Sequence, residues 1–191
     1  MKKYFVYGAL MMSAKVLKNA RAAYIKDHAV EMCLKSSSSF LEPSFAVLFP
    51  KKGAIAWGVI VELSDQEWRS ISAHEESYHL NHLVAYDREG NASEIQAFVS
   101  KNVYNSEINP SSRYARMLYR ASVKYHFPEE VSSRYYQMMK NGNKITRIVF
   151  WYSPLVKKLI PYIGARRARK YVSGVHFAAL ILVIIALVIL L

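Results

Sequence analysis

The chain has 191 residues, enough for one domain of ordinary size and an extension, and its 52% hydrophobic and 13% aromatic residues exclude a chain disordered by its charge. The formal charge of +12 is uneven: residues 140–191 hold nine Lys or Arg and no acidic residue, which leaves 17 basic and 14 acidic residues in 1–139. The single cysteine, Cys33, excludes an intramolecular disulfide framework, and we expect it to be buried as a small apolar residue.

The first third of the chain is rich in segments that favour β structure. Short apolar runs predict strands at residues 3–7, 28–34, 44–49 and 54–63. Residues 13–27 carry apolar side chains near helical spacing, which predicts a helix between the first two strands. Lys51-Lys52-Gly53 has the composition of a turn between the third and fourth strands.

The middle of the chain begins with a capping box. In Ser64-Asp65-Gln66-Glu67, the Ser64 hydroxyl can accept from the amide of Glu67 while the Glu67 carboxylate accepts from the amide of Ser64, which predicts a helix over 65–73. Strands at 79–86 and 94–100 follow, and then helices that begin near Pro110 and Pro128. Strands first and helices later indicate an α+β domain over residues 1–139.

The C-terminus has the composition of a membrane span. Residues 177–191 are fifteen consecutive apolar residues, and extension back to Val172 adds only three interruptions. A helix of about 20 residues is roughly 30 Å long, the thickness of a hydrocarbon core. We therefore expect a single-pass transmembrane tail anchor at 172–191. The basic residues before it place the folded domain on the cytoplasmic side.

Residues 140–171 form a juxtamembrane segment rich in basic and aromatic residues. Such a segment suits an interface with anionic lipid, and equally a linker whose charges only fix topology. The basic residues that could contact anionic lipid are Lys157, Lys158, Arg166, Arg167, Arg169 and Lys170. Nucleic acid is not an expected partner, because these charges would lie beside the membrane.

Three features of the domain could carry chemistry, and each is weak alone. Gly8 ends a strand and enters a predicted helix, and the exposed backbone amides at a helix N-terminus can hold a carboxylate or an oxyanion. Glu75 and Glu76 stand side by side, although most such glutamates are only solvated. His79 and His82 face opposite sides of a predicted strand, so no metal site is expected.

Five segments together resemble the gamma-glutamylcyclotransferase superfamily, and they occur in the family's order. The first is YFVYGAL at Tyr4–Leu10, and the others are AWGVIV at 56–61, ISAHEE at 71–76, NPSSRY at 109–114 and the run at 121–135. The resemblance implies a small mixed β-barrel with peripheral helices. It also implies intramolecular cyclisation of a small gamma-glutamyl compound, with release of 5-oxoproline and a free amine or amino acid, without metal or cofactor.

The resemblance also implies roles for individual residues. Glu75 falls on the catalytic glutamate, which acts as general acid and base. The resemblance implies two groups of substrate-binding residues. Tyr7, Gly8, Ala9 and Leu10 form a loop whose backbone amides hold the substrate, and Tyr104 and Tyr114 are pocket aromatics.

Two departures from the family pattern keep a second interpretation open. Ala9 replaces the usual serine, and Glu76 replaces the glycine that follows the catalytic glutamate. A like charge at Glu76 could raise the pKa of Glu75 or crowd the site. The alternative is therefore a catalytically inactive, membrane-anchored relative that acts as a ligand-binding or scaffold protein.

Overall fold

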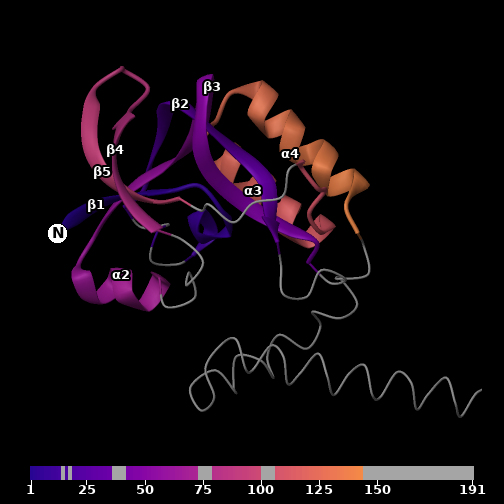
Figure 1. The fold of residues 1–191 in the computed structure, drawn as a ribbon, viewed down its shortest axis with the longest axis horizontal. Helices are drawn as coiled ribbons and strands as arrows, with labels where there is room; N and C mark the ends of the chain where they lie inside the picture. The colour runs from indigo at the N-terminus through magenta and orange to yellow at the C-terminus, as the bar shows by residue number, and fades with distance from the viewer. Residues whose placement is uncertain (14–15, 17–18, 36–41, 73–78, 100–105, 144–191) are drawn as a thin grey trace, which may run out of the picture. The chain divides into compact units, whose positions relative to one another are not determined.

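Five strands close into a barrel in the order β1-β3-β2-β4-β5 (Figure 1). The computed structural model describes residues 1–13, 16, 19–35, 42–72, 79–99 and 106–143. The strands are β1 Lys2–Val6, β2 Arg21–Lys35, β3 Ser44–Leu63, β4 His79–Tyr86 and β5 Ala92–Val99. The helices are the 3-10 turn η1 Ala9–Met12 and the α-helices α2 Asp65–Ser72, α3 Ser112–Lys124 and α4 Glu129–Asn141. The α+β class and the barrel with peripheral helices are confirmed.

The barrel is built on one long antiparallel ribbon and closed by one parallel pair. β2 and β3 pair antiparallel from Arg21↔Ile60 to Lys35↔Ser44. β1 pairs antiparallel with β3, and β4 pairs antiparallel with β5. β1 then runs parallel to β5, so the N-terminal strand joins the two halves of the sheet. The end of β1 therefore lies where both halves meet.

The helix predicted at residues 13–27 is wrong for its second half, because β2 begins at Arg21. Ala23 and Ile25 are buried, and Tyr24 between them is partly exposed, which is the period of a strand. Their apolar spacing also fits a helix, but pairing with β3 satisfies the backbone and buries both side chains. Residues 14–15 and 17–18 lie outside the described residues.

The turn predicted at Lys51-Lys52-Gly53 is also wrong, because β3 runs through it as one strand of 20 residues. The register with β2 shifts between Lys26 and His28, which marks a bulge. Asp27 and Gly53 both have positive φ angles, of 55° and 76°. The amide of Gly53 donates to Asp27 Oδ1 at 2.8 Å. Turn-type residues here bend a long ribbon and do not end it.

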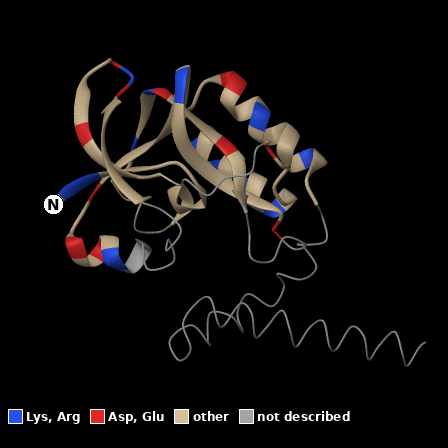
Figure 2. Cartoon of the chain, in the orientation of Figure 1, with Lys and Arg blue, Asp and Glu red and all other residues tan. Residues whose placement is uncertain are grey.

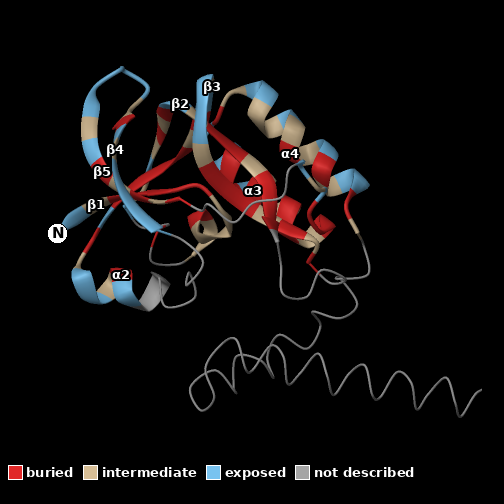
Figure 3. Cartoon of the chain, viewed as in Figure 1, coloured by how far each residue is buried: buried red, intermediate tan, exposed pale blue. Residues whose placement is uncertain are grey.

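Parts of β1 and β3 are buried (Figure 3), and the buried residues of the described chain are mostly apolar or aromatic. Trp68 of α2 stacks on Tyr4 with ring centroids 3.7 Å apart and on Phe98 at 4.9 Å. These contacts attach α2 to β1 and β5. Cys33 is buried as expected, and burial raises the pKa of its thiol to about 11.

The start of α2 confirms the predicted capping box. Ser64 N donates to Glu67 Oε2 at 2.9 Å, and Glu67 N donates to Ser64 Oγ at 3.3 Å. Acidic residues occupy the first turns of α2 and α4, and Arg69 and Lys140 occupy their last turns (Figure 2). This order of charges complements the helix dipoles.

All of the described residues belong to one compact unit, Met1–Arg147. The predicted tail anchor, and the juxtamembrane segment after Asn143, lie outside the described residues. Among the helices of the described part, none is long and apolar enough to cross a membrane.

Candidate functional site

The loop after β1 presents backbone amides at the closure point of the barrel. η1 is a single 3-10 turn in which Met11 N donates to Gly8 O at 3.0 Å. The amides of Ala9 and Leu10 begin this turn, and no acceptor for them is present among the described residues. The loop therefore offers two donors to an oxyanion or a carboxylate.

Tyr7 connects this loop to β5, the strand that runs parallel to β1. Its side chain is buried, and its hydroxyl donates to the backbone carbonyl of Phe98 at 2.8 Å. Phe98 belongs to β5, which pairs with β1. The loop is thus fixed to both strands of the parallel pair.

Tyr114 of α3, more than 100 residues later in the chain, contacts the same loop. A Cβ placed on Gly8 would lie 3.2 Å from the Tyr114 hydroxyl oxygen, so only a hydrogen fits here without pressure on the tyrosine. Ala46 N, on β3, donates to the same hydroxyl at 3.2 Å. Phe45 packs edge-on against the Tyr114 ring at 5.2 Å. The structure therefore brings together Gly8 and Tyr114, two residues that the sequence singled out.

α3 is held in place at both ends. Its N-cap is Ser111, whose Oγ accepts from Tyr114 N at 3.0 Å. At its C-terminus, the Tyr125 hydroxyl donates to the carbonyl of Met11 at 3.4 Å. α3 therefore contacts η1 through a second tyrosine, and burial raises the pKa of Tyr125.

A buried carboxylate, Glu42, lies behind the first turn of α3, and sequence analysis missed it. Its side chain is 4% exposed, and it contacts Ser111 and the guanidinium of Arg113. The available signal was one acidic residue in the apolar run Phe40-Leu41-Glu42-Pro43. The amide of Ala46 was also missed, because a backbone donor has no signature in a sequence.

Burial raises the pKa of Glu42, although the contacts with Ser111 and Arg113 act in the opposite direction. Relative to the unfolded chain, folding therefore shifts the carboxyl toward its protonated form, while Ser111 and Arg113 favour the charged form. The stability that protonated Glu42 contributes is complete below its unfolded pKa of about 4.3 and is lost as the pH rises through the higher folded pKa.

Glu75, Glu76 and Tyr104 lie outside the described residues. In the chain, Glu75 and Glu76 fall between the end of α2 at Ser72 and the start of β4 at His79.

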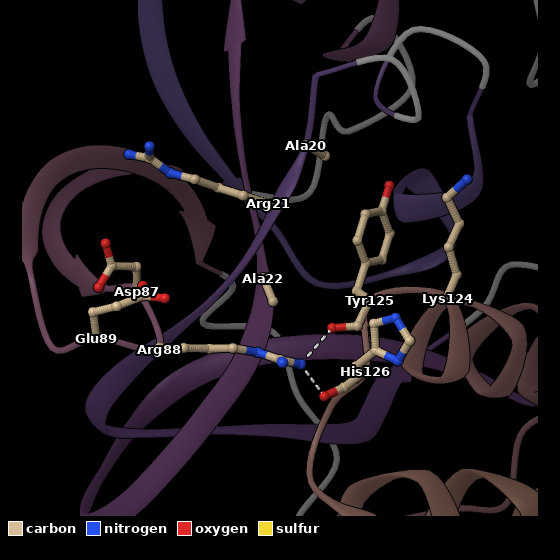
Figure 4. Close-up of a pocket in the computed structure, with 9 residues that line it drawn as sticks. All are labelled: Ala20, Arg21, Ala22, Asp87, Arg88, Glu89, Lys124, Tyr125 and His126. Carbon is tan, nitrogen blue, oxygen red and sulfur yellow. Dashed lines mark hydrogen bonds between the residues drawn. The ribbon is translucent and has the colours of Figure 1, made fainter.

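A hollow of about 410 Å³ lies between β2, the β4–β5 turn and the end of α3, and Tyr7–Leu10 are not among its lining residues (Figure 4). Arg88 crosses it and donates to the carbonyls of Tyr125 and His126, which caps the C-terminus of α3. Its wall also holds the acids Asp87 and Glu89 and the bases Arg21 and Lys124. We place the candidate site at the Gly8 loop, because two of the residues singled out by the sequence, Gly8 and Tyr114, meet there.

Residues 4–121 match the family described as gamma-glutamyl cyclotransferase, AIG2-like. A solved gamma-glutamyl cyclotransferase has a TM-score of 0.60 at 18% identity, covering 70% of this chain and 85% of its own. An uncharacterized protein from Homo sapiens has a TM-score of 0.60 at 19% identity, with the same coverage of 70% and 85%. YkqA from Bacillus subtilis has a TM-score of 0.60 at 18% identity, over 75% of this chain and 55% of its own.

A comparison with curated proteins gives no match. Because the family match spans more than half of the sequence, the chain belongs to the gamma-glutamyl cyclotransferase, AIG2-like family. The solved structures share its fold, and at such identities they show the fold alone. The family resemblance read from five motifs is confirmed, whereas the roles of the single residues stay predictions.

Proposed function

We propose that the chain is a gamma-glutamyl cyclotransferase whose substrate binds at the Gly8 loop. The observation that carries this proposal is the Gly8 loop of a chain of this family, in which the amides of Ala9 and Leu10 begin a turn and Gly8 lies against the Tyr114 hydroxyl. An anionic or polarised oxygen needs donors of this kind, held rigidly before the substrate arrives.

The reaction needs little from the protein, because both reacting groups belong to one molecule. The α-amine nitrogen attacks the γ-carbonyl carbon and closes a five-membered ring. The bond from that carbon to the leaving nitrogen then breaks. A protein that holds the substrate in its reactive conformer supplies an effective molarity of about 10⁵ M or more in well-oriented cases.

Proton transfer is the part of the reaction that needs a side chain. The α-amine is protonated in water, so it must first lose one proton to the solvent to expose its lone pair, and a base must then remove a second proton as the nitrogen attacks. In our proposal Glu75 takes this proton and returns it to the leaving nitrogen, and no water is consumed. The products are 5-oxoproline and the free amine or amino acid.

The proposal is tested with the purified full chain and a panel of gamma-glutamyl amino acids, glutathione and gamma-glutamylamines. We expect 5-oxoproline from at least one compound, and none from the same compound with an acetylated α-amine, because that nitrogen cannot close the ring. If a folded chain is silent across the panel, the inactive relative becomes the better account. Ala9 and Glu76 would then mark a lost site.

We also propose that residues 172–191 anchor the chain in a membrane, with residues 1–139 facing the cytoplasm. The apolar run and the basic residues before it support this proposal. After alkaline carbonate extraction, we expect the full chain to stay with the membranes and a chain lacking 172–191 to be released. Release of the full chain would contradict the anchor.

A further inference from the structure

The buried carboxylate of Glu42 contacts the start of the helix that carries Tyr114. Oε1 accepts from the backbone amide of Ser111 at 3.1 Å, and Oε2 accepts from Nη2 of Arg113 at 3.3 Å. A negative charge at this place meets both the first amides of α3 and the positive end of its dipole.

From this carboxylate a short series of contacts leads to the candidate site. Glu42 holds the backbone of Ser111, and the Ser111 hydroxyl caps the amide of Tyr114. Glu42 also stands four residues before Ala46, whose amide donates to the Tyr114 hydroxyl. One carboxylate thus ties the chain entering β3 to the first turn of α3. The Tyr114 hydroxyl lies between these two elements, against Gly8.

Stability alone is a poor reason for this ion pair. Removing the Glu42 carboxylate from water is costly, and the Arg113 side chain, which is 35% exposed, repays little of that cost because solvent screens the pair. α3 also has other contacts at this end, since Ser112 N donates to Asn143 O at 3.0 Å and Ser112 Oγ donates to Met139 O at 2.7 Å. The helix can therefore begin without Glu42, and what the carboxylate adds is a contact between the chain entering β3 and the first turn of α3.

We propose that Glu42 is a positioning residue, which acts through Ser111 to hold the Tyr114 hydroxyl against the Gly8 loop and so sets substrate affinity. This inference rests on the proposed function, because it takes Tyr114 and the loop as the substrate-binding surface. Glu42 is 3% exposed and does not touch the reacting atoms.

The test is a double-mutant cycle in the full chain with Glu42→Gln, Tyr114→Phe and the double variant. Glu42→Gln is expected to raise KM about tenfold with little change in kcat, as lost binding does. In the Tyr114→Phe background the same substitution should change KM less than twofold, because residues that act through one contact are not additive. Glu31→Gln, at a second acid that forms an ion pair, here with Lys51 at 2.7 Å, is the matched control and should leave KM unchanged.

A purely structural role predicts the opposite pattern. The effects on KM would then be the same in both backgrounds, and that result would overturn the proposal. If Glu42→Gln does not fold, Glu42→Asp replaces it, since one methylene less withdraws the carboxylate from Ser111 while its charge remains.

Hydrogen exchange separates this inference from the proposed function, because it needs no turnover. The Ala46 amide should exchange about tenfold faster in Glu42→Gln and in Tyr114→Phe, and no faster still in the double variant. The Ala97 amide on β5 should be unchanged and serves as the internal reference. An Ala46 amide that Glu42→Gln leaves unaffected would refute the role of Glu42. If no compound of the panel gives 5-oxoproline while the Ala46 amide exchanges faster in Glu42→Gln, only the proposed cyclotransferase activity is refuted.

Discussion

Replacing Glu75 by Gln is expected to lower kcat for 5-oxoproline release about 10³-fold, the usual scale of general acid–base catalysis. The amide keeps the size and polarity of the side chain and removes its ability to accept the proton of the α-amine. KM should change little, because in our proposal the substrate is held by the amides of Ala9 and Leu10. The measurement is steady-state kinetics with a compound that the wild-type chain converts.

Glu76→Gly is the matched control for this substitution, because it restores the family's glycine beside the same carboxylate. Activity should be unchanged or higher, since a neighbouring negative charge is removed. If Glu75→Gln keeps its activity while Glu76→Gly loses it, Glu76 is the base. The family's catalytic glutamate would then correspond to Glu76 and not to Glu75.

The second large effect is on stability, at Gly58 in the middle of β3. A Cβ built on Gly58 would lie 2.5 Å from Cζ of Phe5 and 2.6 Å from the carbonyl oxygen of Val6. We expect Gly58→Ala to lower the free energy of unfolding by about 3 kcal/mol, the upper end of ordinary overpacking. The corresponding fall in Tm is roughly 10 °C for a chain of this size. Thermal unfolding of the full chain measures it.

Two further variants show where the strain lies. Ile55→Ala, at a side chain that is 56% exposed on the same strand, should change Tm by no more than a degree or two. Phe5→Leu removes the ring atoms nearest to the new methyl group, but the Val6 carbonyl stays in place. Any rescue in the double variant should therefore be partial. A Gly58→Ala chain as stable as the wild type would show that β1 can move away from β3.

Gly58 also links the fold to the site. Val6 is the last residue of β1, and the Gly8 loop begins two residues later. Strands β1 and β3 can approach closely at Gly58 because it has no side chain. The glycine of the AWGVIV motif is therefore explained by packing, because it allows β3 to approach Phe5 and Val6 of β1, directly before the Gly8 loop.

Local signals in the sequence predicted local structure well. The capping box at Ser64 and Glu67 needs only four residues, and the structure contains it as predicted. The strand at His79–Tyr86 and the helices that follow Pro110 and Pro128 are also confirmed. By contrast, the helix predicted over 13–27 and the turn at 51–53 were wrong. Both depend on the pairing of β2 with β3, which joins residues far apart in the chain.

The candidate site was predictable only in part for the same reason. Tyr7–Leu10 and Tyr114 came from the family motifs, and the structure places Tyr114 against Gly8. The closure of β1 on β5, which fixes Tyr7, has no local signature. Glu42 gave little signal, because its role depends on the distant residues Ser111 and Arg113.

The central claim is that the chain closes a ring within its substrate and does not hydrolyse it. The most direct measurement is product analysis in ¹⁸O-labelled water, with a gamma-glutamyl compound and no added acceptor. We predict equal amounts of 5-oxoproline and free amine, with no ¹⁸O incorporated by the enzymatic step. Release of ¹⁸O-labelled glutamate would show attack by water and would contradict ring closure. The absence of any product from every compound of the panel would contradict it equally.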